Sequence, residues 1–554
     1  MEHVSVLFLP LLGLPIELLK HLLEFVPHRD LPACCRVSKL FHTLAAPILY
    51  RRLWLRDQIR LHKVFKVLGG APHLASLLRV VEVRVFPFGL PAEQLEALEI
   101  AIIKTFQNAN NLEELIWTRT GSLNDRVLRT VFDKTPKLKL LELTGDSRSW
   151  SPDLLIAKMP SVIERVSIIM PDRPVTERIP DIAKRLGPNL QSLSVLSNNA
   201  AFIRDAYIEA AAPFLTSLTR LSLVGCKNVT GSAVLAILKQ NPSRILELSL
   251  EGLSLVPAEI DRIARLSTKI KTLAITHPAK ASPEFYDSLA SWIENSHQLR
   301  RLTFYRMSGE VAAPDEEQTA SDDEEEGADR PELLPHDAAP GAPHIAASAE
   351  ASSSTLPTTT PASDSPHLER FRNQPYRPQP PTGTVPASRS RGGAPSDPLL
   401  SSTFLQRVIA ARGAELVQLR IHRLAMTIEQ LGLICHSCPQ LEDLVVHLYE
   451  PESEIIKAHL SALPRLRSVH ILASLRSGLE MSEANLRDVA ASASTTLRQI
   501  GFRNRVWEVI PNLEDTSMAR QSATQTNVSR RNVALRRWDA SQGNWPEAFL
   551  VVRV

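Results

Sequence analysis

The chain has 554 residues, of which 44% are hydrophobic and 22% charged, and its formal net charge is +3. This composition is typical of a globular protein, and the charge is too small to indicate nucleic acid or an anionic membrane as a partner. The length predicts several domains or one elongated repeat array.

The five cysteines are odd in number and predict no disulfide framework, so we expect a reducing, cytoplasmic and/or nuclear location. Cys435 and Cys438 form a single C-x-x-C pair without the second pair that a zinc site needs, and we interpret them as buried structural thiols. No apolar run reaches the roughly 18 residues that span a bilayer. Residues 1–13 are expected to be a lead-in that packs on the first helix.

Leucines near the start of the chain recur every four residues, at Leu14, Leu18 and Leu22, and predict an amphipathic helix that Pro27 ends. Asp30 is expected to cap a second helix, and a third is expected to begin at Ser38 and to end before Pro47. Three helices of this length cannot bury all their leucines, so a partner or the next domain must cover some.

The same residues carry a resemblance. Leu14-Pro15-x-Glu17-Leu18, then Asp30-Leu31, then Val37-x-Lys39-x-Phe41 resemble the F-box motif, although Ser38 and Phe41 stand where Cys and Trp are common. The resemblance implies that a Skp-type adaptor binds Leu14, Pro15, Glu17, Leu18, Leu22, Asp30, Leu31, Val37, Lys39 and Phe41. On pattern alone, a helical cap of a repeat array fits as well.

A pattern of apolar residues, apolar-x-x-apolar-x-apolar, then returns along the chain. It begins at Leu78, Leu112, Leu138, Ile163, Leu190, Leu218, Ile245, Ile270, Leu299, Leu416, Leu441, Leu466 and Leu497. From Leu112 to Leu299 the spacing is 25 to 29 residues, at the upper end of the range of leucine-rich repeats. A doubly wound α/β sheet is the alternative, but the chain lacks a Gly-rich phosphate loop.

One repeat shows how the pattern works. Leu218, Leu221 and Leu223 predict a short strand, and Thr230 is expected to cap a helix that Asn241 and Pro242 end. Cys226 stands at the turn where leucine-rich repeats that follow F-boxes place Asn or Cys, and the repeats resemble that class. It is the only Cys at such a turn, so the repeats are degenerate.

Residues 308–398 interrupt the repeats. They hold 15 of the 40 prolines, with an acidic run at residues 322–326, and such a composition predicts disorder. The segment is expected to be one long strand-to-helix loop of a continuous array. Its function is either that of a solvated spacer or regulatory, with Ser321 as a candidate phosphorylation site.

Residues 503–510 and 549–554 are apolar and β-prone, and we expect them to pair or stack as a cap that covers the last repeat. The alternative is that Trp507, Trp538 and Trp545 form a substrate-facing aromatic patch. The full assignment is a lead-in at 1–13, an F-box at 14–56, repeats at 57–307 and 399–512, the insert at 308–398 and the cap at 513–554.

These features together predict an α/β fold, in which a small helical F-box precedes a leucine-rich-repeat horseshoe. We found no catalytic, cofactor or metal motif, and therefore expect a binding protein rather than an enzyme. The resemblance implies the substrate-recognition subunit of an SCF-type ubiquitin ligase, joined through the adaptor to cullin and RING subunits and binding a protein substrate. A repeat scaffold without a ubiquitin role is the alternative, and an unrecognised α/β enzyme is a third.

The substrate is expected on the concave strand face or the rim loops of the repeats. The concave-face positions that the pattern identifies are mixed in charge: Glu114, Lys139, Glu142, Thr219, Ser222, Ser249 and Thr272.

Overall fold

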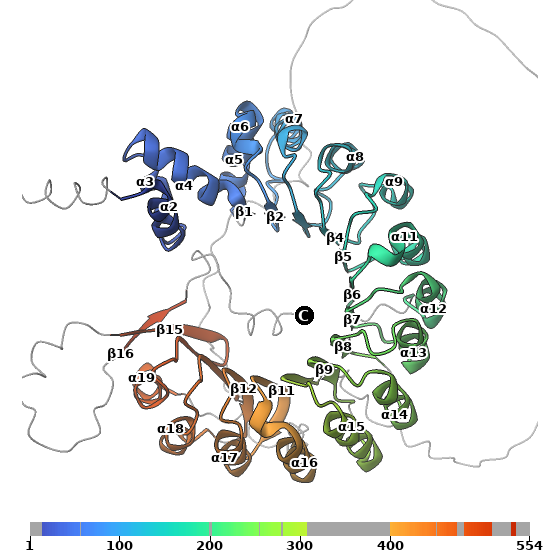
Figure 1. Cartoon of the computed structure of the whole chain (residues 1–554), viewed down its shortest axis with the longest axis vertical. Coiled ribbons are helices and arrows are strands. Elements are labelled where there is room, and N and C mark those ends of the chain that lie inside the picture. Colours follow the sequence, from blue (N-terminus) through green and yellow to red (C-terminus); the bar gives the residue numbers. More distant parts are fainter. Residues whose placement is uncertain are drawn as a thin grey trace, which may run out of the picture. The chain divides into compact units, whose positions relative to one another are not determined.

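The computed structural model describes residues 14–55, 57–198, 202–253, 255–278, 281–306, 399–449, 451–473, 481–511 and 533–538. All of these described residues belong to one compact unit. Within this unit three short helices precede a single curved sheet, with its strands on the inner side and a row of helices on the outer side (Figure 1).

Within the described residues, the sheet is built in chain order from 16 strands, β1 to β16. Neighbouring strands from β1 to β14 are parallel, and β15 and β16 are antiparallel additions at the end. The strands are β1 (Arg52–Leu55), β2 (Val80–Val83), β3 (Glu114–Trp117), β4 (Leu140–Thr144), β5 (Arg165–Ile169), β6 (Ser192–Leu196), β7 (Arg220–Val224), β8 (Glu247–Glu251), β9 (Thr272–Thr276), β10 (Arg301–Tyr305), β11 (Gln418–Met426), β12 (Asp443–Leu448), β13 (Ser468–Ala473), β14 (Gln499–Phe502), β15 (Arg505–Pro511) and β16 (Val533–Arg537).

Helices connect these parallel strands and cover one face of the sheet. They are α5 (Gln58–Gly70), α6 (Pro72–Ala75), α7 (Ala92–Asn108), α8 (Asp125–Lys134), α9 (Pro152–Lys158), α10 (Arg173–Glu177), α11 (Ile179–Leu186), α12 (Asp205–Ala211), α13 (Gly231–Gln240), α14 (Pro257–Leu266), α15 (Pro283–Asn295), α16 (Ser402–Arg412), α17 (Ile428–Ser437), α18 (Ser453–Leu460) and α19 (Glu483–Ser492). We call the opposite face, which the helices leave uncovered, the inner face.

The predicted repeats are confirmed, because a parallel strand begins two residues after each predicted motif start, from Leu78 to Leu497. Every motif start is at most 1% exposed, and the alternate strand residues that follow pack with it in one continuous core. A single strand and helix cannot bury this apolar side alone, so each repeat depends on its neighbours. The predicted α/β solenoid is therefore the observed fold.

The repeat around β7 has the predicted boundaries. The Thr230 hydroxyl accepts a hydrogen bond from the Ser232 amide at 3.2 Å, and α13 ends at Gln240, directly before Asn241. Cys226 is fully buried, and its Sγ lies 3.5 Å from the Val224 carbonyl oxygen. Burial raises the pKa of this thiol to about 12, so Cys226 acts as a small apolar residue of the core.

The N-terminal helices are α2 (Ile16–Glu24), α3 (Leu31–Cys34) and α4 (Lys39–Arg51). The third helix was expected to begin at Ser38; α4 begins one residue later, and Ser38 is its N-cap, accepting from the Phe41 amide at 3.2 Å. Two predictions were wrong. Asp30 stands at the N-cap of α3, but its side chain makes no capping hydrogen bond. The third helix continues through Pro47 to Arg51, because Ile48 and Leu49 pack on the core of the small helical module.

The sheet is continuous across the insert. Strand β10, just before residues 307–398, pairs directly with β11 after them, with Arg301 opposite Gln418 and Tyr305 opposite His422. On the outer side, Arg407 of α16 forms ion pairs of 2.8 Å with both Asp287 and Glu294 of α15. The structure thus agrees with a long loop in an unbroken array, while the predicted disorder and the Ser321 hypothesis concern residues outside the described part of the chain.

The two ends of the sheet differ from the predicted boundaries. Residues 52–55, assigned to the F-box, form β1 and pair with β2. Residues 505–511 form the expected terminal strand β15, which pairs with β14 on one side and β16 on the other. The other expected partner, residues 549–554, lies outside the described residues, as do Trp545 and the lead-in 1–13. Trp507 is 5% exposed and belongs to the core.

Asn241 joins successive repeats through its side chain. The side chain is fully buried, accepts from the Leu218 amide at 2.9 Å, and donates to the carbonyl oxygens of Leu215 and Ile237. We expect Asn241→Ala to lower the free energy of unfolding by about 3 kcal/mol, because each buried group left without a partner costs about 1–3 kcal/mol.

Urea denaturation measures this change, with Asn189→Ala as the matched control. Asn189 donates one hydrogen bond of 2.9 Å to the Ser161 carbonyl from an exposed position, so its loss should cost about 1 kcal/mol. Equal destabilisation by the two variants would contradict the bridging role of Asn241.

Candidate functional site

The small helical module has a compact core. Leu23 of α2, Leu31 of α3 and Ala45 of α4 are at most 3% exposed and pack together, with Phe41 and Leu44 partly buried against them. This core fixes the three helices relative to one another, so the side chains on their outer faces hold defined positions.

The structure places the predicted adaptor-binding residues in three groups. Most of them are exposed: Pro15, Glu17, Leu18, Leu22, Asp30, Val37 and Lys39. Leu14 and Phe41 are half-buried. Leu31 is only 1% exposed, so its side chain supports the module from inside.

Large apolar side chains gather on the exposed surface of this module. Leu18 is 50% exposed, Leu22 45% and Val37 48%. Ile16, Phe25 and Leu40 are also exposed, and the sequence prediction did not include them. These six exposed apolar side chains lie on helices α2 and α4 and in the turns beside them. The helical period itself could have indicated Phe25, which follows Leu18 by seven residues and Leu22 by three.

The two kinds of predicted site residue should respond differently to substitution. We expect Leu31→Ala to lower the stability of the helical module by about 2–5 kcal/mol, because it removes buried methyl groups and leaves a cavity. Leu18→Ser should change it by about 0.5 kcal/mol or less, because that side chain is half exposed.

Hydrogen–deuterium exchange of peptides from residues 16–51 reports this stability separately from that of the solenoid. Faster exchange in the Leu18→Ser protein than in the Leu31→Ala protein would contradict the assigned core.

The second candidate surface is the inner face of the sheet. In its first strands the charges are matched: Arg52 and Arg84 both pair with Glu82, and Arg84 also lies 3.8 Å from Glu142. Arg165 pairs with Glu114 at 2.7 Å. Burial raises the pKa of the Glu142 carboxyl, although Arg84 opposes this effect. The two predicted positions Glu114 and Glu142 therefore belong to a network that neutralises itself.

The remaining predicted inner-face positions are uncharged or lie at the edge. Ser222, Ser249 and Thr272 are on β7, β8 and β9, while Lys139 and Thr219 directly precede β4 and β7. Lys139 forms an ion pair of 3.2 Å with Glu164. A shallow depression of about 570 Å³ lies near this edge, but its polar side chains Asn189 and Arg244 already donate hydrogen bonds to backbone carbonyls.

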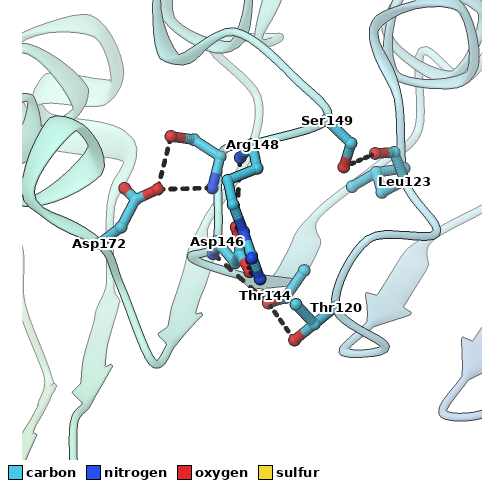
Figure 2. Close-up of polar contacts among 8 residues, drawn as sticks. Thr120, Leu123, Thr144, Asp146, Arg148, Ser149 and Asp172 are labelled. Atoms are coloured by element: carbon cyan, nitrogen blue, oxygen red, sulfur yellow. Dashed lines mark hydrogen bonds and ion pairs between the residues drawn. The ribbon is translucent and has the colours of Figure 1, made fainter.

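At the opposite edge, the loops after β3 and β4 are tied to their neighbours (Figure 2). The hydroxyls of Thr120 and Thr144 lie 3.3 Å apart, and Ser149 donates to the Leu123 carbonyl at 2.7 Å. Asp172 accepts from both the amide and the hydroxyl of Ser147 at 2.7 Å. These polar groups are used to position the loops, which makes this rim a rigid edge.

The inner face changes in character at β11 to β13. His422, His447 and His470 lie on three successive strands and are 2%, 7% and 3% exposed. Burial is the largest cause that lowers the pKa of His422, to about 3, with Arg420 adding to the effect. Burial also lowers the pKa of His470, although its Nε2 lies 2.7 Å from the Arg503 carbonyl. The lowered pKa values favour the neutral imidazole of His422 and of His470 at pH 7.

Neutral His422 makes the fold sensitive to acid. The residues around it are Arg420 and Arg423 on its own strand, Tyr305 on β10, His447 on β12 and His470 on β13. Because folding depresses the pKa of His422, its contribution to stability is present above the unfolded value of 6.5 and is lost as the pH falls toward about 3.

We therefore expect the free energy of unfolding of His422→Gln to fall less than that of the wild type between about pH 7 and about pH 4. The difference between the two proteins should reach up to about 3 kcal/mol. Urea denaturation at a series of pH values measures the difference. His42→Gln, on the exposed face of α4, serves as the control, and a wild-type-like acid response of His422→Gln would refute the assignment.

Cys435 and Cys438 are at most 1% exposed, at the end of α17 and directly after it, and burial raises the pKa of both thiols to about 12. Among the described residues, no group of His, Cys, Asp and Glu side chains could hold a metal ion. Within the same residues, no helix combines the length and the apolar character needed to cross a membrane.

Comparisons with known proteins identify a domain family that matches the small helical module. The F-box domain family matches residues 11–46. No curated protein matches the chain by sequence. Among solved structures, a chain of the yeast Rad7–Elc1 complex is 11% identical, with a TM-score of 0.38 over 79% of this chain and 90% of that one.

A leucine-rich-repeat protein from Legionella pneumophila, LegL7, is 12% identical, with a TM-score of 0.34 over 71% of this chain and 95% of that one. These likenesses are too distant to define the fold, which follows from the strands and helices described above. The chain therefore carries an F-box domain at residues 11–46, followed by a leucine-rich-repeat solenoid.

Proposed function

We propose that this chain is the substrate-recognition subunit of an SCF-type ubiquitin ligase. F-box domains bind Skp1-type adaptors, and the match to this domain at residues 11–46 is the observation that carries the proposal. The adaptor would connect the chain to cullin and RING subunits.

The surface of the module supports this role. Leu18 and Leu22 present about half of their side chains to solvent from one face of α2, while Leu19 and Leu23 on the same helix are buried. An adaptor that covers the exposed leucines would bury apolar area that the folded chain leaves in contact with water. The predicted site residues Leu14, Pro15, Glu17, Asp30, Val37, Lys39 and Phe41 remain part of this proposed contact.

The solenoid would hold the substrate. A repeat array offers a long inner face and two rims to a protein partner, and leaves the chemistry to other subunits. The receptor would then contribute proximity, because holding the substrate beside the conjugating enzyme makes an occasional encounter effectively intramolecular. In this proposal the chain itself is not an enzyme.

Adaptor binding tests the proposal. We expect the double variant Leu18→Ser/Leu22→Ser to lose at least about 30-fold in affinity for a purified Skp1-type adaptor, because the loss of even one central contact of about 2 kcal/mol has this effect. Isothermal titration with the full chain measures the affinity.

The matched control is Ile59→Ser/Val67→Ser. These two side chains on α5 are 67% and 51% exposed, so the substitutions remove similar apolar surface outside the F-box domain. The control should bind the adaptor as the wild type does. A wild-type chain that does not bind the adaptor would disprove the proposed function and favour an interaction scaffold without a ubiquitin role.

A further inference from the structure

Charged residues are distributed unevenly along the inner face of the solenoid. Across β1 to β5, three arginines are matched by three glutamates in the pairs described above. The part of the inner face at β10 to β12 carries four arginines and one carboxylate. These residues are Arg301 on β10, Arg306 directly after it, Arg420 and Arg423 on β11, and Asp443 on β12. We call these five residues the basic inner patch. Of these two groups of strands, only β10 to β12 carry an excess of positive charge.

Two of these arginines, Arg306 and Arg423, lie next to the paired residues Tyr305 and His422. The Arg306 amide donates to the His422 carbonyl at 3.2 Å. The Arg423 guanidinium lies 5.8 Å from the centre of the Tyr305 ring, and Tyr305 is paired in register with His422. Both arginine side chains are half-buried, so they remain in contact with solvent.

The backbone conformation at Arg423 is irregular. The pairing of β11 with β12 shifts between Arg420 and Ala425, and Arg423 has a φ of 58°. A non-glycine residue at positive φ is uncommon and strained, and such residues gather at sites of function. At this irregularity the guanidinium of Arg423 lies against the ring of Tyr305 on the neighbouring strand.

The patch also contains a polar group without a partner. His422 is 2% exposed, and its Nε2 finds no hydrogen-bond partner among the described residues. A buried polar atom without a hydrogen-bond partner is unfavourable, and a ligand that bonds with it would remove that cost. Arg420 is already paired with Asp443, so the charge available to a ligand comes from Arg301, Arg306 and Arg423.

We propose that the basic inner patch, together with His422, binds an acidic protein segment rich in Asp and Glu, as the recognition site for a substrate. Arginine guanidinium groups pair with carboxylates through parallel hydrogen bonds, and a neutral imidazole can donate to a further carboxylate. The chain's formal net charge of only +3 favours this compact anion site over the extended phosphate contacts of nucleic acid. The identity of the bound segment as a substrate rests on the proposed function, whereas its binding does not.

Fluorescence anisotropy with the full chain tests the proposal directly. The probe is a fluorescein-labelled peptide of alternating Glu and Gly, and the reference peptide has Gln in place of Glu. We expect the Glu peptide to bind, the Gln peptide not to bind, and the affinity to fall with added salt, because ions screen partly exposed charges.

The deciding variant is Arg306→Gln/Arg423→Asn, in which Asn tolerates the positive φ at position 423. It should weaken binding of the Glu peptide at least about tenfold. The control Arg129→Gln/Arg265→Gln removes the same charge from exposed positions on α8 and α14 and should keep wild-type affinity. Thermal unfolding of both variants shows whether the fold is intact.

Other results would overturn the proposal. These are no binding of the Glu peptide, equal weakening by the two variants, or equal competition by single-stranded DNA, which would indicate a general preference for polyanions. Titration of the same proteins with the Skp1-type adaptor separates the two proposals. If the chain binds the Glu peptide but not the adaptor, the proposed ligase role is wrong, whereas the proposed binding of an acidic segment is supported.

Discussion

Parallel pairing of each strand with the strand of the next repeat is the constraint on which this molecule depends. One repeat supplies a strand of about five residues and a helix, and the apolar side of that unit has no cover of its own. Pairing β2 with β3, and so on to β14, aligns the motif leucines of successive repeats into one core. The register is uniform over the first strands, so inner-face side chains of neighbouring strands also stand side by side there. The matched arginines and glutamates near the start are a consequence of that register.

The same constraint explains which features the sequence could predict. A motif start such as Leu138 or Ile270 recurs at a steady spacing because it must fill the same place in every repeat, so the period alone located the strands. The first strand, β1, was missed because Arg52–Leu55 follows a helix directly and has no full motif in front of it. Helix α4 was expected to end before Pro47, but contacts made by Ile48 and Leu49 outweigh the local preference of proline.

The candidate sites likewise include residues that the sequence could predict and residues that it could not. The exposed leucines of α2 follow from helical spacing, so Leu18 and Leu22 were identified from the sequence. Leu31 was assigned to the surface, although the packing of α3 on α4 buries it, and only a three-dimensional structure shows this. The basic inner patch was not predicted, because it depends on two non-local features. These are the pairing of β10 with β11 across a long insert and a bulge in β11 that no repeat pattern encodes.

The pairing of β10 with β11 has a further consequence for the integrity of the chain. The covalent link between these strands runs through residues 307–398, but the strands themselves are held by backbone hydrogen bonds, by the Arg407 ion pairs between α15 and α16, and by Arg412, which donates to the Ile293 carbonyl at 3.1 Å. The contact between β10 and β11 is thus held by non-covalent interactions and not by the covalent link through residues 307–398. A protease cut anywhere in the insert would leave two polypeptides that still share one hydrophobic core, and the solenoid would survive as a non-covalent pair of fragments.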